Sequence, residues 1–79
     1  MKKIEKQAFA VTCYSKSLQT VIGTYTSAGY TNNNDCRKAF YSSYKPLIGR
    51  DAEETYIDYE HVIYASEDLV YKVSFGVRV

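Results

Sequence analysis

Few residues of this 79-residue chain are of the types that form catalytic or metal sites: there is one histidine, two cysteines and no tryptophan. His61, Cys13 and Cys36 together supply one ligand fewer than the four of a structural zinc site, so we expect no metal. Two isolated cysteines are more typical of buried thiols than of a disulfide in a reducing compartment. Motifs for a nucleophile elbow or a phosphate-binding loop are also missing. We therefore predict a non-enzyme without a cofactor.

Long apolar runs are absent as well. No stretch approaches the roughly 20 apolar residues that a membrane-spanning helix requires. Residues 1–7 begin like a signal peptide, but the apolar stretch at 8–14 is short, contains Thr12 and leads into the polar residues 15–17. These features predict a cytoplasmic protein that has no membrane partner.

Tyrosine is abundant, with nine copies against three phenylalanines. Its side chain combines a large apolar ring with a hydrogen-bonding hydroxyl, which suits a partly solvated surface. The apolar content of 46% and charged content of 24% are typical of a folded chain. A chain of this length forms one domain, residues 1–79, that buries only about 60–65% of its unfolded surface. Its margin of stability is therefore small.

The charges are divided between the two parts of the chain. Residues 1–50 contain eight Lys or Arg and two acidic residues, whereas residues 51–79 contain seven acidic and two basic residues. The corresponding net charges are +6 and −5. Such separation affects association and the choice of partner more than it affects the fold, so it indicates a binding protein.

Hydrophobic periodicity predicts strands at 8–14, 18–26, 55–65 and 69–79, with Gly23 as a site for a bulge. A helix is expected after the turn at 28–35, capped by Asn34 or Asp35 and ended near Lys45 by Pro46. We therefore predict one α+β domain, β-β-α-β-β, with a four-stranded antiparallel sheet and one helix on one face. The expected packing stripe of the helix comprises Cys36, Ala39, Phe40, Ser43, Tyr44 and Leu47.

The third strand region carries the main candidate binding surface. If residues 55–65 form one unbroken strand, tyrosines and carboxylates alternate along its exposed face and the remaining acids precede it. Tyrosine provides contact area and carboxylates steer a basic protein partner, although the same pattern also occurs on a solvated sheet face. The candidate protein-binding residues are Asp51, Glu53, Glu54, Tyr56, Asp58, Glu60 and Tyr64.

Two alternatives concern nucleic acid. The outer helix face carries Arg37, Lys38, Tyr41 and Lys45, which would serve an RNA- or DNA-binding module that binds phosphates and stacks bases. A sequence pI near 7.7 makes this less favoured than protein binding. The third hypothesis is a small ribonuclease centred on His61, but adjacent strand residues point to opposite faces, so Glu60 could not pair with His61.

The last strand has the most regular alternation. Leu69, Tyr71, Val73, Phe75, Val77 and Val79 are predicted to share one face. If the strand lies at an edge, it would pair with a second copy and give a homodimer; if it lies in the centre, the helix would cover it. Part of the 55–79 hairpin is also long enough to project from so small a domain.

The leading functional hypothesis combines size, charge and composition. We predict a protein inhibitor or adaptor that acts stoichiometrically through its acidic, tyrosine-rich surface. Small tyrosine-rich domains without catalytic motifs are frequent among phage and mobile-element products that block host defence proteins or toxins. This origin is an expectation from size class, and the residues themselves do not specify it.

Overall fold

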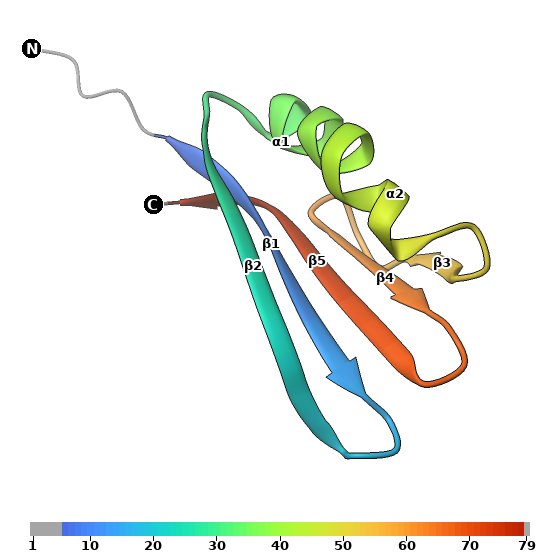
Figure 1. Cartoon of the computed structure of the whole chain (residues 1–79). Coiled ribbons are helices and arrows are strands. Elements are labelled where there is room, and N and C mark those ends of the chain that lie inside the picture. The colour runs from blue at the N-terminus through green and yellow to red at the C-terminus, as the bar shows by residue number, and fades with distance from the viewer. Residues whose placement is uncertain (1–5, 79) are drawn as a thin grey trace, which may run out of the picture.

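A computed structural model describes residues 6–78 as a single antiparallel sheet with one helical layer on one face (Figure 1). The strands lie in the order β2-β1-β5-β4-β3. In chain order the elements are β1 (Gln7–Ser15), β2 (Thr20–Tyr30), α1 (Asn33–Ala39), η1 (Phe40–Tyr44), α2 (Lys45–Ile48), β3 (Glu53–Tyr56), β4 (His61–Ala65) and β5 (Leu69–Arg78).

The α+β class and the helix on one face are confirmed, but the prediction of four strands is wrong. The region expected as one strand at 55–65 is a hairpin, because residues 57–60 leave the sheet and turn back. Asp58 stabilises this turn by accepting a hydrogen bond from the Glu60 amide at 2.8 Å. The sheet therefore has five strands and ends in the short strand β3.

The helical layer is longer than predicted. Asn32, rather than Asn34 or Asp35, caps it by accepting a hydrogen bond from the Asp35 amide at 2.8 Å. The helical path continues past Pro46 to Ile48 through the π-helical turn η1. A π turn contains an additional residue, which changes the direction of the side chains that follow it.

Two members of the predicted packing stripe, Ser43 and Leu47, are exposed, because the π turn redirects the side chains within and after it. Cys36 and Phe40 are buried as expected, and Tyr44 packs against them with partial exposure. Beyond the π turn, Ile48 contacts the core, whereas Leu47 is 75% exposed. The stripe thus advances in steps of four residues, from 36 to 40, 44 and 48.

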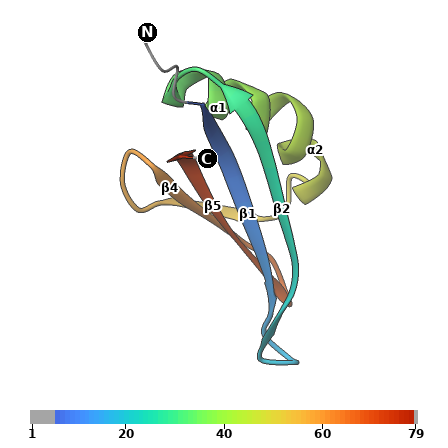
Figure 2. The same cartoon turned by 90° about the vertical axis from the view of Figure 1, so that its left-hand side faces the viewer.

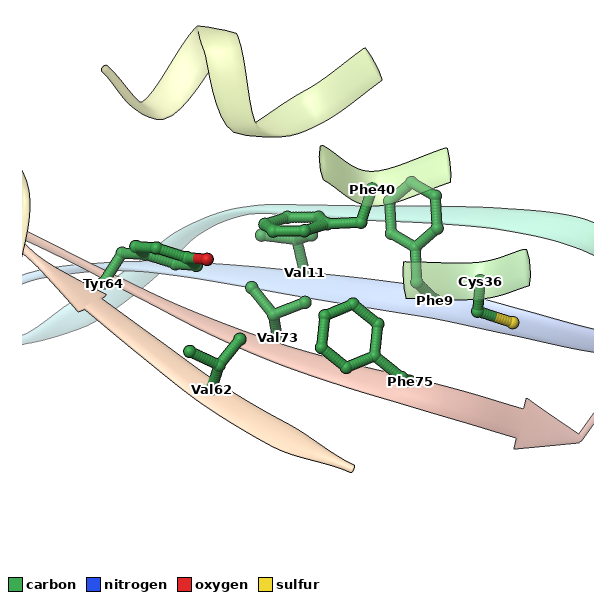
Figure 3. Packing of buried hydrophobic residues seen from close by; sticks show 8 residues of the cluster. All are labelled: Phe9, Val11, Cys36, Phe40, Val62, Tyr64, Val73 and Phe75. Carbon is green, nitrogen blue, oxygen red and sulfur yellow. The ribbon is translucent and has the colours of Figure 1, made fainter. Parts of the chain in front are cut away.

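Phe40 occupies the centre of the core between helix and sheet (Figure 3). Its ring centroid lies 5.6 Å from that of Phe9, 5.5 Å from that of Phe75 and 5.8 Å from that of Tyr64. These rings come from β1, β5 and β4, so one side chain links three strands to the helix. The remaining buried members of the cluster are Val11, Cys36, Val62 and Val73. Both cysteines are free thiols, and Cys13 is only half-buried.

Strand β5 is central, with β1 on one side and β4 on the other. A second copy could therefore pair with β5 only by displacing one of these strands. Its alternation is also interrupted: Phe75 pairs with Phe9 and Val77 with Ala8, which leaves Gly76 as a bulge with φ of +74°. Val77 consequently leaves the face of Val73 and Phe75, and Val79 lies outside the described residues.

The described molecule is elongated, with principal extents of 50 × 22 × 21 Å. The helical layer covers one end of one sheet face, and the β1–β2 hairpin extends furthest from it (Figure 2). The projecting segment is thus the first hairpin, whereas the sequence had indicated the 55–79 region as long enough to project. Asp68 lies in the turn between β4 and β5 and joins it to the β1–β2 hairpin. It accepts hydrogen bonds from the Ser17 amide at 2.9 Å and the Ser15 hydroxyl at 3.0 Å.

Candidate functional site

Most of the predicted acidic surface lies at the β3 edge of the sheet. We call residues 53–60, which comprise β3 and the turn after it, the acidic edge. Asp51 is exposed in the loop that precedes it. Six of the seven predicted protein-binding residues are exposed: Asp51, Glu53, Glu54, Tyr56, Asp58 and Glu60.

Tyr64 is the exception, because it is fully buried and faces the helix. The hairpin at 57–60 gives β4 an alternation of its own, in which Val62 and Tyr64 point to the core. Tyr64 pairs across the strands with Glu54, and Val62 pairs with Tyr56. Opposed residues of an antiparallel pair share a face, so Glu54 and Tyr56 also lie on the helix side. The expected exposed row from Tyr56 to Tyr64 is therefore wrong at Tyr64.

Three tyrosine hydroxyls and one carboxylate meet between the helix and β3. Tyr64 donates a hydrogen bond to Glu54 Oε2, and the Tyr41 hydroxyl donates to the same oxygen at 3.5 Å. The Tyr41 hydroxyl also lies 3.2 Å from that of Tyr56. These contacts tie the sheet edge to the helix.

Burial, followed by the hydrogen bond to Glu54, raises the pKa of Tyr64. The hydrogen bond to Tyr41, followed by that to Glu54, raises the pKa of Tyr56. The cluster joins the helical layer, β3 and β4 through side-chain hydrogen bonds.

The turn at 57–60 is held on several sides. Asp58 Oδ1 lies 2.8 Å from His61 Nδ1, and this contact, together with the Glu60 amide, lowers the pKa of Asp58. The Phe75 amide donates to the Glu60 carbonyl at 2.8 Å, which joins the turn to β5. Arg37 donates to the Tyr59 carbonyl at 2.9 Å from the helix. These contacts restrict the conformational freedom of the turn.

This turn also exposes apolar surface that the sequence prediction missed. Tyr59 is 70% exposed, and Ile57 and Tyr56 are each 57% exposed. With the outward row that the sequence analysis predicted, an unbroken strand through 55–65 would have directed Ile57 and Tyr59 inward. The signal for the turn was Asp58, since Asp commonly accepts a hydrogen bond from the backbone two residues ahead.

The basic helix residues are largely engaged within the molecule. Besides its hydrogen bond to Tyr59, the Arg37 guanidinium lies 4.8 Å from the centroid of the Phe75 ring. Lys45 donates to the Gly49 carbonyl at 3.2 Å and lies 5.2 Å from the Tyr64 centroid, and Tyr41 joins the hydroxyl cluster. Of the four residues predicted to contact nucleic acid, Lys38 is the one that is exposed, and the other three are half-buried.

His61 lies on the sheet face away from the helix, beside an open depression of about 300 Å³. Lys72 and Ser74 line the same depression together with apolar side chains. The imidazole pairs with Asp58 and not with Glu60, and the side chains of both partners are about half exposed. His61 is still the centre of the ribonuclease hypothesis, and the cationic side chain of Lys72 lines the same depression.

The part of the chain that the structure describes contains no group of three or more His, Cys, Asp or Glu side chains able to hold a metal ion. None of its helices is long and apolar enough to cross a membrane. In comparisons with known proteins, no family model, curated protein or solved structure matches this chain. Its function is therefore argued from the geometry of the site.

Proposed function

We propose that this protein is a stoichiometric inhibitor or adaptor whose acidic edge binds a basic surface of another protein. The observation that carries the proposal is the turn at 57–60, which exposes Ile57 and Tyr59 beside the carboxylates of Asp58 and Glu60 and is held in place from three other elements. Aromatic anchors supply most of the affinity in many interfaces, and surrounding charges increase the rate of association.

We narrow the set of residues that we assign to binding. Glu53, Asp58 and Glu60 supply the charge, and Ile57 and Tyr59 supply the apolar contact. Glu54 and Tyr64 are instead assigned to support, because their side chains bond to each other beneath β3. A product of a phage or mobile element that occupies a basic site of a host defence protein or toxin in the cytoplasm fits this proposal.

Charge reversal at the acidic edge tests the proposal. Asp58 is unsuitable because its carboxylate holds the turn, so the test variant is Glu53→Lys/Glu60→Lys. The matched control is Glu67→Lys, which places the same kind of change on an exposed acid in the β4–β5 turn. Each protein is used as bait in a lysate at low and high salt, and captured proteins and nucleic acid are identified.

We expect a defined basic protein to be captured at about equal stoichiometry by the wild type and the Glu67→Lys control. The double variant should lose it, and the association rate measured with the purified partner should fall by roughly tenfold or more at low salt. Capture that is equal for all three proteins would contradict the proposal. Nucleic acid that is lost on Lys38→Ala would instead assign binding to the helix.

A further inference from the structure

The edge strand β2 has features that protein edges usually avoid. It is eleven residues long, pairs with β1 on one side only and contains neither proline nor a charged residue. Val21 and Ile22 are each 50% exposed, and Tyr25 is 45% exposed. A long, uncharged edge with unpaired backbone groups is a template for pairing with another strand.

Two bulges limit the part of β2 that is regular. Cys13 pairs with Gly23 and Tyr14 with Val21, so Ile22 is an additional residue. Near the other end Gly29 is skipped in the pairing and has φ of +107°. Between these bulges residues 23–28 form an uninterrupted run, which is long enough for several cross-strand pairs.

We propose that β2 pairs antiparallel with β2 of a second copy, with the two-fold axis at Tyr25, so that two sheets join into one of ten strands. An antiparallel ladder alternates between two kinds of residue pair, and two-fold symmetry makes equivalent pairs identical. The axis must therefore pass through a residue paired with itself. Tyr25 is the middle residue of β2 and lies within the regular run.

The sequence of β2 is complementary to itself in this register. Thr24 lies opposite Thr26 of the second copy on both sides of the axis, which is a favourable β-branched pair. Gly23 then lies opposite Ser27 of the second copy, a pair of small residues that stays within the regular run. No like charges meet, because β2 has none. This self-complementarity favours a second copy over an unrelated strand.

The dimer has a consequence that rests on the proposed function. Because β3 and β2 are opposite edges of each sheet, the two acidic edges would lie at the far ends of the joined sheet. One dimer would then bind two partner sites, and a multivalent partner would be held with higher avidity.

Two charge variants test the pairing without reference to the partner. Thr24→Lys/Thr26→Lys and Thr24→Glu/Thr26→Glu change exposed side chains, and each places like charges opposite each other twice in the dimer. Sedimentation velocity over a range of concentrations measures the association of each variant, of the wild type and of an equimolar mixture. Thr55→Lys, an exposed residue of β3, is the control at the other edge.

We expect the wild type and Thr55→Lys to dimerise, and the dissociation constant of each charged variant alone to rise by roughly tenfold or more. The mixture should recover dimerisation, because Lys then lies opposite Glu, and this recovery also shows that both variants are folded. A wild type that stays monomeric, charged variants that still dimerise alone, or a mixture that does not recover would each overturn the proposal. If β2 instead receives a strand of another protein, the wild type alone stays monomeric.

Discussion

The two edges of the sheet differ in length, charge and anchoring. Strand β3 has four residues, two of them glutamates, and its side chains bond to Tyr41 of the helical layer and to Tyr64 of β4. Strand β2 has eleven residues without charge, and its distal part extends beyond the helix. Short, charged edges resist strand addition, whereas long, uncharged edges invite it. We therefore infer that β3 presents side chains to a partner and that β2 presents its backbone.

The largest effect should come from removing the anchor of the β3 edge. Tyr64→Ala deletes a fully buried ring and the hydroxyl that donates to Glu54, so we expect a loss of about 3–5 kcal/mol in the free energy of unfolding. Ile22→Ala at the bulge of β2 should change it by about 0.5 kcal/mol or less, since that side chain is half exposed. Urea unfolding of both variants checks the comparison. Equal losses would show that the edges are anchored alike.

The next effect concerns binding rather than folding. Tyr59→Ala removes a ring that is 70% exposed, and we expect about 2 kcal/mol of binding energy to be lost with the captured partner. The hydrogen bond from Arg37 goes to the backbone of this residue, so the turn should remain in place. Calorimetric titration measures the affinity, and thermal unfolding should show little change. An unaltered affinity would show that Tyr59 does not contribute to the interface.

A smaller effect isolates the hydroxyl of the anchor. Tyr64→Phe keeps the ring but leaves Glu54 without its donor, which should cost about 1–2 kcal/mol of stability. Glu54→Gln retains an acceptor for the same hydroxyl and should cost less. Urea unfolding of these two variants separates the hydrogen bond from the packing of the ring. A Tyr64→Phe variant as stable as the wild type would show that packing alone anchors β3.

The smallest effect is a dependence of stability on acid. The His61 contact lowers the pKa of Asp58, and the Ser17 amide, followed by the Ser15 hydroxyl, lowers that of Asp68, each from an ordinary value of 3.8. A lowered pKa in the folded state adds stability that is complete above the unfolded value and is lost as pH falls through the folded value. We therefore expect unfolding free energy to decrease below about pH 4.

Asp58→Asn and Asp68→Asn should each reduce this decrease, which unfolding curves at a series of acidic pH values would measure. Asp68 joins the β4–β5 turn to the β1–β2 turn, whereas Asp58 acts within the β3–β4 hairpin. An acid dependence that is identical in the wild type and in both variants would assign it to other carboxylates.

The sequence was sufficient to predict local structure where periodicity was unbroken. Strands β1 and β2, the helix with Cys36 and Phe40 inward and the inward face of β5 from Val73 to Phe75 follow from their patterns. The failures lie at single residues that shift the phase of a pattern. Asp58 starts a turn within an apparent strand, the π turn redirects Leu47, and Gly76 inserts a bulge.

The sequence predicted the charge of the candidate site but not its shape. Acidic residues of 51–60 are exposed as expected, because carboxylates are seldom buried without a partner. The supporting role of Tyr64 and the exposure of Tyr59 depend on the hairpin, which pairs residues that are distant along the chain. The central position of β5 likewise depends on pairing with β1, and periodicity alone does not specify which strands are neighbours.

Residue-resolved amide hydrogen exchange, measured at several protein concentrations and then with the captured partner, tests the division between the two edges most directly. We expect rising concentration to protect the amides within 23–27 of β2 that point away from β1, and to leave those of the acidic edge unchanged. Adding the partner should protect residues 57–60. Protection of β2 by the partner, or no dependence on concentration at 23–27, would contradict this division.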